Sequence, residues 1–237
     1  MSFRINLDQV VKKFDSFFAL RSFSEVVKKG DRISILGHNG AGKSTLLNMI
    51  ATLTRPSSGN IDYEQHGARL NDKVQIRSLL SYLGHEPMLY PDLTGLENLR
   101  FVARLNGQPH DDACLLEHLE TVGMQKARNR LLRTCSRGMQ QRLSIARVLV
   151  SRPQLLLLDE PFSGLDSEGL ARFSKFFSDS DFSWLLVTHD MEQAWSMANR
   201  FWILKRGKLI HSLDRADLSH ANFLELAREG TMAGVDQ

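Results

Sequence analysis

The sequence holds little cysteine, little proline and no long apolar run. Of its 237 residues, 2 are cysteine and 6 are proline. Cys114 and Cys135 are too few to build a disulfide framework and lack the spacing of a metal site, which excludes a disulfide-rich secreted domain. We therefore expect reduced thiols. The longest apolar runs, such as residues 155–158, are about four residues long, whereas a membrane-spanning helix needs about 20.

The sequence also lacks a large excess of either sign of charge. Lys and Arg number 30 and Asp and Glu number 27, so the formal net charge is +3, far from the basic excess typical of nucleic-acid binding. Arg4 and Asp8 interrupt the first ten residues, which argues against a signal peptide there. The chain, 42% hydrophobic and 24% charged, is too apolar to be disordered. We expect a soluble globular chain with no nucleic-acid partner, whose membrane role, if any, comes through another protein.

The sequence does contain short apolar runs that alternate with helical patterns. A strand, a glycine-rich turn and a helix over residues 43–52 follow one another, an order typical of an α/β sheet with crossover helices. Residues 155–158 and 184–187 are apolar throughout, as expected of strands buried on both faces of a parallel sheet. The predicted strands are residues 3–10, 32–36, 79–83, 155–158, 184–187 and 200–204.

Residues 94–150 differ, because they carry helical spacing and almost no strand signal. Leu96, Leu99 and Val102 recur at intervals that place them on one face of a helix. The segment therefore predicts an α-helical insertion in the α/β core. The residues from Gly230 onward are small and polar and predict a frayed tail.

A glycine-rich loop carries the first chemical signal. Residues 37–45 read G-H-N-G-A-G-K-S-T and match the pattern G-x-x-x-x-G-K-[ST]. Glycines let backbone N–H groups curl around an anion, and the following helix adds its positive end. The lysine of this pattern places a charge on the β- and γ-phosphates, and the next hydroxyl ligates Mg²⁺. The alternative is a glycine turn with a surface lysine. The residues predicted to bind nucleotide are Gly37, His38, Asn39, Gly40, Ala41, Gly42, Lys43, Ser44 and Thr45, with Ser44 also a metal ligand.

Two adjacent acids follow the apolar strand predicted over residues 155–158. Ligands of parallel sheets bind beyond the carboxyl ends of the strands, where Asp159 and Glu160 are expected to lie. Asp159 is predicted to hold Mg²⁺ directly or through water, and Glu160 to polarise an attacking water as a general base. The alternative interpretation is an ordinary solvated turn at a strand end.

Further segments make the sequence resemble the ATP-binding cassette (ABC) ATPases. Residues 135–147, C-S-R-G-M-Q-Q-R-L-S-I-A-R, resemble the family's signature motif L-S-G-G-Q-Q-Q-R. Residues 163–166, S-G-L-D, resemble its D-loop, and residues 188–190, T-H-D, resemble the segment of its switch histidine. Phe14 stands where the family stacks an aromatic ring on adenine. The resemblance covers residues 3–212, roughly, and five motifs occur in the family's order.

The resemblance implies a fold class. It is an α/β P-loop NTPase cassette with a RecA-like, mostly parallel sheet core, an antiparallel β subdomain and an α-helical subdomain. It also implies one ABC ATPase domain over residues 3–229. The core would be formed by about 3–85 and 153–229 and the helical subdomain by about 86–152, followed by a flexible tail at 230–237.

The resemblance further implies ATP hydrolysis, with ATP and Mg²⁺ as cofactors. In the family, the signature of one subunit closes over the ATP held by another, so a second cassette is expected, in a homodimer or a heterodimer. Lys43, Glu160 and His189 would be catalytic, with His189 contacting the γ-phosphate. The remaining residues implied to bind nucleotide are Phe14, Ser136, Gly138 and Asp166.

The sequence departs from the family pattern at the signature and at one possible metal ligand. Met139 replaces the signature glutamine and Arg137 replaces its first glycine, whereas Ser136 and Gly138 remain. His85 stands where many cassettes place a glutamine that contacts Mg²⁺ or its water. One ring nitrogen of a neutral histidine accepts a hydrogen bond, so His85 is predicted to contact both nucleotide and metal. Arg137 is also a candidate for phosphate or interface pairing, against the plainer interpretation of a solvated basic helix face.

The expected partner is a separate membrane permease. Residues 85–99 resemble the cassette surface that receives a coupling helix from such a subunit, which would hold the chain on the inner face of the cell membrane, peripheral and cytoplasmic. Within the family, residues 51–59, 82–86, 93–105 and 136–142 resemble the ATPase subunit of the heme exporters of cytochrome c maturation. The alternatives are the ATPase of another exporter (drug, lipid or polysaccharide) and a soluble cassette of translation or repair. A GTPase or kinase is disfavoured, because those proteins lack the signature.

Overall fold

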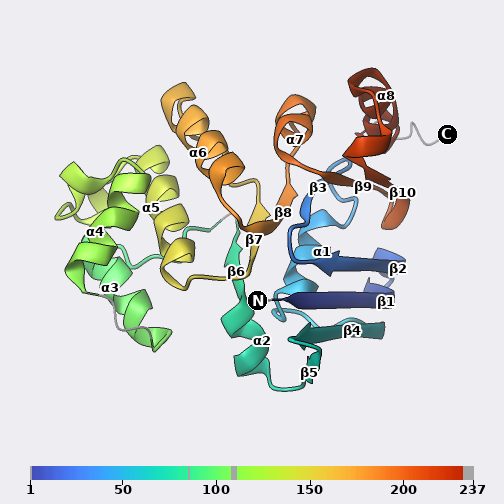
Figure 1. Ribbon diagram of the computed structural model, residues 1–237, viewed down its shortest axis with the longest axis horizontal. Helices are drawn as coiled ribbons and strands as arrows, with labels where there is room; N and C mark the ends of the chain where they lie inside the picture. The colour runs from blue at the N-terminus through green and yellow to red at the C-terminus, as the bar shows by residue number, and fades with distance from the viewer. Residues whose placement is uncertain (1, 85, 108–110, 232–237) are drawn as a thin grey trace.

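The chain builds two β-sheets and a group of helices (Figure 1). The computed structural model describes residues 2–84, 86–107 and 111–231. Its first sheet is antiparallel and has the strand order β2-β1-β4-β5. The bounds are β1 Phe3–Phe14, β2 Phe17–Lys28, β4 Ser58–Gln65 and β5 Ala68–Leu70. This sheet forms the antiparallel β subdomain.

The second sheet is the core and has the order β10-β9-β3-β8-β7-β6. Five of its strands pair in parallel, and β10 runs antiparallel to β9 at one edge. The bounds are β3 Arg32–Leu36, β6 Leu80–Leu83, β7 Leu155–Asp159, β8 Ser183–Val187, β9 Arg200–Lys205 and β10 Lys208–Asp214. Because parallel strands all point the same way, β3, β6, β7 and β8 end at one edge of the sheet.

The central strands are buried on both faces. Every residue of β7 and β8 is buried. Leu155 and Leu157 of β7 pack into the cluster that includes the antiparallel sheet, whereas Leu156 and Leu158 pack into the cluster of the opposite face. Side chains alternate between the faces of a strand, so an uninterrupted apolar run fills both clusters at once. The helices on the two sides are α1 Lys43–Ile50 on the first face and α6 Ser167–Asp179, α7 Met191–Met197 and α8 His220–Thr231 on the second (Figure 1).

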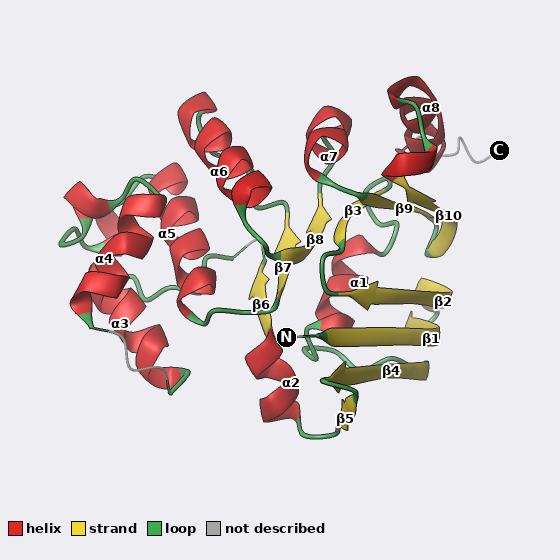
Figure 2. Cartoon of the chain, viewed as in Figure 1, coloured by secondary structure: helices red, strands yellow, loops and turns green. Residues whose placement is uncertain are grey.

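The helical part lies to one side of the core and holds most of residues 94–150 (Figure 2). Helix α3 begins after Thr94, whose hydroxyl accepts a hydrogen bond from the Glu97 N–H while the Glu97 carboxylate accepts one from the Thr94 N–H. This reciprocal cap satisfies two backbone donors that the first helical turn leaves unpaired. The bounds are α3 Gly95–Leu105, α4 Asp112–Thr121 and α5 Arg137–Val150, and a short helix α2 Lys73–Leu79 precedes β6.

The fold class predicted from the sequence is confirmed: the chain has a mostly parallel core, an antiparallel subdomain and a helical subdomain. Each predicted strand is present, although β6 begins at Leu80 because Leu79 ends α2. The helix expected over 43–52 ends at Ile50. The strand patterns in the sequence did not predict β2, β4, β5 or β10. Helix α8 also includes Gly230 and Thr231, which the sequence analysis assigned to the tail, and Gly230 is buried.

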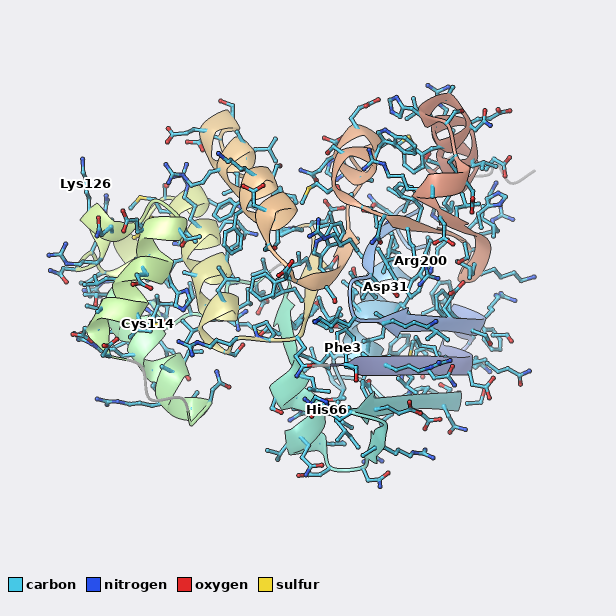
Figure 3. All side chains as sticks on the ribbon, viewed as in Figure 1. Phe3, Asp31, His66, Cys114, Lys126 and Arg200 are labelled. Carbon is cyan, nitrogen blue, oxygen red and sulfur yellow. The ribbon has the colours of Figure 1, made fainter. Side chains whose placement is uncertain are left out.

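A half-buried charge cluster ties the two sheets together where β9 begins. Arg200 lies beside Asp31 in Figure 3, and its guanidinium donates to the Asp31 carboxylate over 2.9 Å and to the Glu25 carboxylate over 3.2 Å. Cys114 and Cys135 are both free thiols. Across the described part of the chain, none of the helices combines the length and apolarity needed to span a bilayer.

Candidate nucleotide site

The phosphate loop connects β3 to α1, and backbone conformation explains two of its glycines. Gly37 has φ +149° and Gly42 has φ +100°, a region that other residues rarely adopt. A Cβ at Gly37 would lie 2.3 Å from the Leu204 carbonyl oxygen, and one at Gly42 would lie 2.2 Å from the Ala19 carbonyl oxygen. The loop is thus pressed between β2 and β9, and side chains at these two positions would push it out.

Lys43 is the buried cation of the loop. It is 8% exposed, and its Nζ donates to the Gly37 carbonyl over 2.7 Å and to the His38 carbonyl over 3.0 Å. Burial lowers the pKa of Lys43, while the charges of Glu160 and Asp159 act to raise it. The buried Lys43 ammonium, with two carboxylates near it, attracts an anionic ligand strongly because the local dielectric constant is low.

The acid pair follows β7 directly. Asp159 is the last residue of β7 and is 1% exposed. The Glu160 N–H donates to the Val187 carbonyl over 3.0 Å, and Glu160 has φ +52°, an uncommon conformation for a residue with a side chain. This turn directs the Glu160 carboxylate toward His189, whose Nδ1 lies 2.9 Å from Glu160 Oε2. The Glu160 side chain is 19% exposed and the His189 side chain 81% exposed, so the pair faces open solvent.

One cavity of about 280 Å³ brings most of these residues together. Its walls come from the β1–β2 turn, the phosphate loop with the start of α1, and the ends of β7 and β8. The lining residues are Phe14, Phe17, Ala19, Asn39, Gly40, Gly42, Lys43, Ser44, Thr45, Asp159, Glu160 and Val187. The residues predicted to bind phosphate therefore share a cavity with two exposed phenyl rings, a layout that fits a nucleotide.

Phe17 is a member of this site that the sequence analysis missed. Phe14 and Phe17 pair across the turn between β1 and β2, and both rings are about half exposed or more. The Lys12 ammonium lies 4.7 Å from the centre of the Phe14 ring. The sequence signal that could have identified Phe17 was its position across a two-residue turn from Phe14.

Three predicted nucleotide-binding residues lie outside the cavity lining. Ser136 caps α5, where its hydroxyl accepts from the Met139 N–H over 3.3 Å. Asp166 caps α6 by accepting from the Gly169 N–H, and it also pairs with Arg142. These two hydrogen bonds hold the pKa of Asp166 below its usual value. Gly138 lies beside the Gly164 carbonyl oxygen. The segments that resemble the signature and the D-loop thus meet each other, and these three residues do not line the cavity of the phosphate loop.

Two predicted histidines, His38 and His189, do not line the cavity. The Nδ1 atom of His38 lies 2.7 Å from the Asn39 carbonyl oxygen, and its Nε2 accepts from the Arg206 N–H over 3.3 Å. Its backbone N–H donates to the Gly230 carbonyl of α8 over 2.9 Å. Gly37 and Ala41 are likewise absent from the lining. His85, predicted as a metal and nucleotide contact, lies outside the described residues.

The oxygen atoms that line the cavity are suitable ligands for Mg²⁺. Ser44 and Asp159 offer a hydroxyl and a carboxylate oxygen, which are hard ligands of the kind that Mg²⁺ prefers. Among the described residues, no group of three or more His, Cys, Asp or Glu side chains could hold a metal by itself. A metal here would therefore take its remaining ligands from phosphate and water, as Mg²⁺ does in nucleotide sites.

Known proteins with this layout are ABC cassettes. The sequence model of the ABC transporter family matches residues 20–163. The chain is 34% identical over 207 residues to the molybdate/tungstate import ATP-binding protein of Pyrococcus horikoshii, covering 85% of this chain and 59% of that protein. It is 30% identical to the bacitracin transport ATP-binding protein of Enterococcus faecalis, covering 94% of this chain and 73% of that one. The match thus spans about three fifths of the length of the first of these relatives.

Solved structures agree with the sequence relatives. A dimeric ATP-binding cassette in a post-hydrolysis state with ADP and Pi is 27% identical, with a TM-score of 0.79 over 89% of this chain and 98% of that chain. The ATP-binding subunit of an ABC transporter gives a TM-score of 0.82 at 24% identity over 94% of this chain and 99% of that chain, a likeness of fold. The family match covers more than half of the chain and is supported by relatives of 34% and 30% identity. The chain therefore belongs to the ABC transporter family, as one of its ATP-binding cassettes.

Proposed function

We propose that this chain binds MgATP and hydrolyses it, as the ATP-binding subunit of an ABC transporter. The observation that carries the proposal is the contact between Glu160 and His189 at the ends of β7 and β8, with Glu160 in the same cavity as the phosphate loop. Glu160 accepts a proton from water as the water oxygen attacks the γ-phosphorus, and the bond to the ADP oxygen breaks. The exposed His189 orients that water and contacts the γ-phosphate. Lys43 holds the phosphates.

Mg²⁺ would be held by Ser44 and Asp159, and it would neutralise charge on the β- and γ-phosphates. The adenine base would stack on Phe14, with Phe17 at the other side of the turn. His85 remains the proposed counterpart of the family's metal-contacting glutamine.

We infer that the complete site needs a second cassette. Ser136, Gly138 and Asp166 lie outside the cavity of their own chain, and the similar post-hydrolysis cassette is dimeric. In a head-to-tail pair, homodimeric or heterodimeric, they would close over the nucleotide of the partner. Hydrolysis by the purified chain should then require Mg²⁺ and rise per chain with chain concentration. A rate per chain that is independent of concentration would argue for a monomeric site.

A groove between the core and the helical part supports a membrane partner. It has a volume of about 310 Å³, and its walls come from the end of α1, from β6 and from α3 and α5. Met88, 52% exposed, and Leu53, 54% exposed, line it. Two exposed apolar side chains beside a groove favour a helix of another protein as the occupant. This groove would hold the chain on the inner face of the cell membrane through a permease.

Replacing Met88 with Asp should release the chain from membranes of its native host. An aspartate at this position would lose its hydration when a partner helix docks on the groove, so we expect the variant in the supernatant after sedimentation, where the native chain is in the membrane pellet. Val74→Asp is the matched control, because Val74 is 74% exposed on α2 and does not line the groove. Equal sedimentation of both variants and the native chain would mean that the groove is not the docking surface.

We propose heme export for cytochrome c maturation as the transport task, on the support of the four sequence stretches named above. The two relatives described above carry other cargo names, molybdate or tungstate and bacitracin. Transport by another exporter, as the bacitracin relative suggests, is the second candidate. Cells of the native host that lack this chain should make c-type cytochromes without covalent heme while b-type cytochromes stay normal. Normal c-type cytochromes in those cells would exclude heme export and favour the second candidate.

A further inference from the structure

We infer that Gly230, in the last turn of α8, is a positioning residue for the phosphate loop: its carbonyl fixes the peptide that holds Lys43. The inference rests on the proposed function, since it concerns the affinity of the loop for nucleotide. It adds to the site a residue that is distant in the sequence and does not line the cavity. The juxtaposition that carries it is the hydrogen bond from the His38 N–H to the Gly230 carbonyl, over 2.9 Å.

One peptide unit of the loop is held from both sides. The Gly37 carbonyl accepts a hydrogen bond from Lys43 Nζ over 2.7 Å, and the His38 N–H of the same peptide donates to Gly230. A peptide unit is planar, so its C=O and N–H groups turn together. Turning the N–H away from Gly230 would therefore turn the C=O away from Lys43. The end of α8 thus fixes the direction of an acceptor of the buried ammonium.

The absence of a side chain at Gly230 allows this close approach. The last four carbonyls of an α-helix have no partner within the helix, which suits the Gly230 carbonyl to accept from the loop. Gly230 does not have the positive φ that favours glycine at many helix ends. A Cβ there would lie 2.3 Å from the Cγ2 methyl of Ile203 and 3.8 Å from the Gly37 Cα. Close packing against β9 and the loop, rather than backbone conformation, therefore requires glycine at this position.

Helix α8 is itself held firmly on the core sheet. Phe223 is fully buried, and its ring centre lies 4.3 Å from that of Phe201 on β9. The carboxylate of Glu229, the residue before Gly230, lies 3.0 Å from Nε2 of His211 on β10. These contacts seat α8 on the edge of the sheet that β9 and β10 form (Figure 1). The Gly230 carbonyl is therefore a fixed acceptor, to which the loop conforms.

Gly230→Ala should loosen the loop without loosening the helix. Alanine is the better helix former, but its Cβ would meet the buried, β-branched Ile203 side chain, so the end of α8 must move off the loop. Because one hydrogen bond is lost, we expect the His38 amide to exchange with solvent deuterium about tenfold faster, by NMR, and ADP affinity in EDTA to fall about fivefold. Arg228→Ala, an exposed change in the same turn, is the matched control and should alter neither quantity.

A second substitution distinguishes positioning of the loop from general stability. Adding Ile203→Ala to Gly230→Ala removes the methyl group that the new Cβ meets. His38 exchange and ADP affinity should then return to within about twofold of wild type, although the melting temperature falls because a cavity is left in the core. If Gly230 acted only through stability, the double variant would be the least stable chain and would bind ADP most weakly.

The exchange of the His38 amide is measured without nucleotide, so it separates the inference from the proposed function. A Gly230→Ala chain with wild-type exchange and wild-type ADP affinity would overturn the inference. Faster exchange with unchanged affinity would overturn it too, because the contact would then not position the loop. A wild-type chain that binds no ADP would overturn the proposed function, and the inference with it, even if the His38 amide exchanges as expected.

Discussion

Glu160→Gln should abolish ATP turnover while leaving ATP binding intact. Glutamine has nearly the same shape and can still hydrogen-bond His189, but it cannot take a proton from the attacking water. Loss of a general base costs about 10²- to 10⁴-fold in rate, so turnover should fall at least about 100-fold. ATP that is bound and not hydrolysed should also hold two chains together. The measurements are phosphate release and size-exclusion chromatography with MgATP, where a dimer should appear that wild type does not retain.

The control for this variant is Glu117→Gln. Glu117 is an exposed acid on α4, outside the cavity lining, so its substitution removes one negative charge without touching the site. It should keep wild-type turnover and show no trapped dimer. A fully active Glu160→Gln variant would exclude Glu160 as the base. An inactive variant that stays monomeric with MgATP would retain the base and contradict the dimeric site.

Much of the site could be predicted because its motifs are local. The phosphate-loop motif is nine adjacent residues that follow a strand and run into a helix, and the pair of Asp159 and Glu160 stands at the end of a strand whose other residues are all leucine. Each motif carries its own physical requirement in adjacent residues: glycine conformations at Gly37 and Gly42, and a strand end for the acids. The parallel core followed from the same signal, since β7 and β8 must be buried on both faces.

Other features of the fold and the site depend on contacts between segments that are distant in the chain, and a single sequence does not reveal such contacts. Strand β4 is largely polar and half exposed, and it exists because it pairs with β1 rather than because of its own propensity. Tyr82 stands opposite Leu157 only through the register of β6 on β7. The sequence predicted that Gly230 belongs to a frayed tail. Its carbonyl instead accepts a hydrogen bond from the His38 N–H, and a Cβ at Gly230 would lie 2.3 Å from an Ile203 methyl group. Tertiary packing decided each of these.

Lys43→Ala should weaken nucleotide binding itself rather than only the chemical step. The Lys43 ammonium is held among loop carbonyls and is nearly excluded from water, so its attraction to phosphate is poorly screened. Hydrogen bonds to charged groups contribute about 1.5–3 kcal/mol, which corresponds to a loss of about 10- to 100-fold in ATP affinity by calorimetry. Because burial lowers the pKa of Lys43, the folded protein disfavours this charge. Removing it should therefore leave the melting temperature of the nucleotide-free chain near or above that of wild type.

The two expected results, weaker ATP binding and a preserved melting temperature, distinguish a binding role of Lys43 from a structural one. Lys73→Ala, at an exposed position at the start of α2, is the matched control and should change neither affinity nor melting temperature. A Lys43→Ala variant that unfolds at a much lower temperature without nucleotide would mean that the lysine mainly holds the loop carbonyls together. Unchanged ATP affinity would mean that residues 37–45 are not the phosphate loop. A lost ATP-dependent rise in melting temperature, with the nucleotide-free value preserved, is the result that ties the buried charge of Lys43 to phosphate.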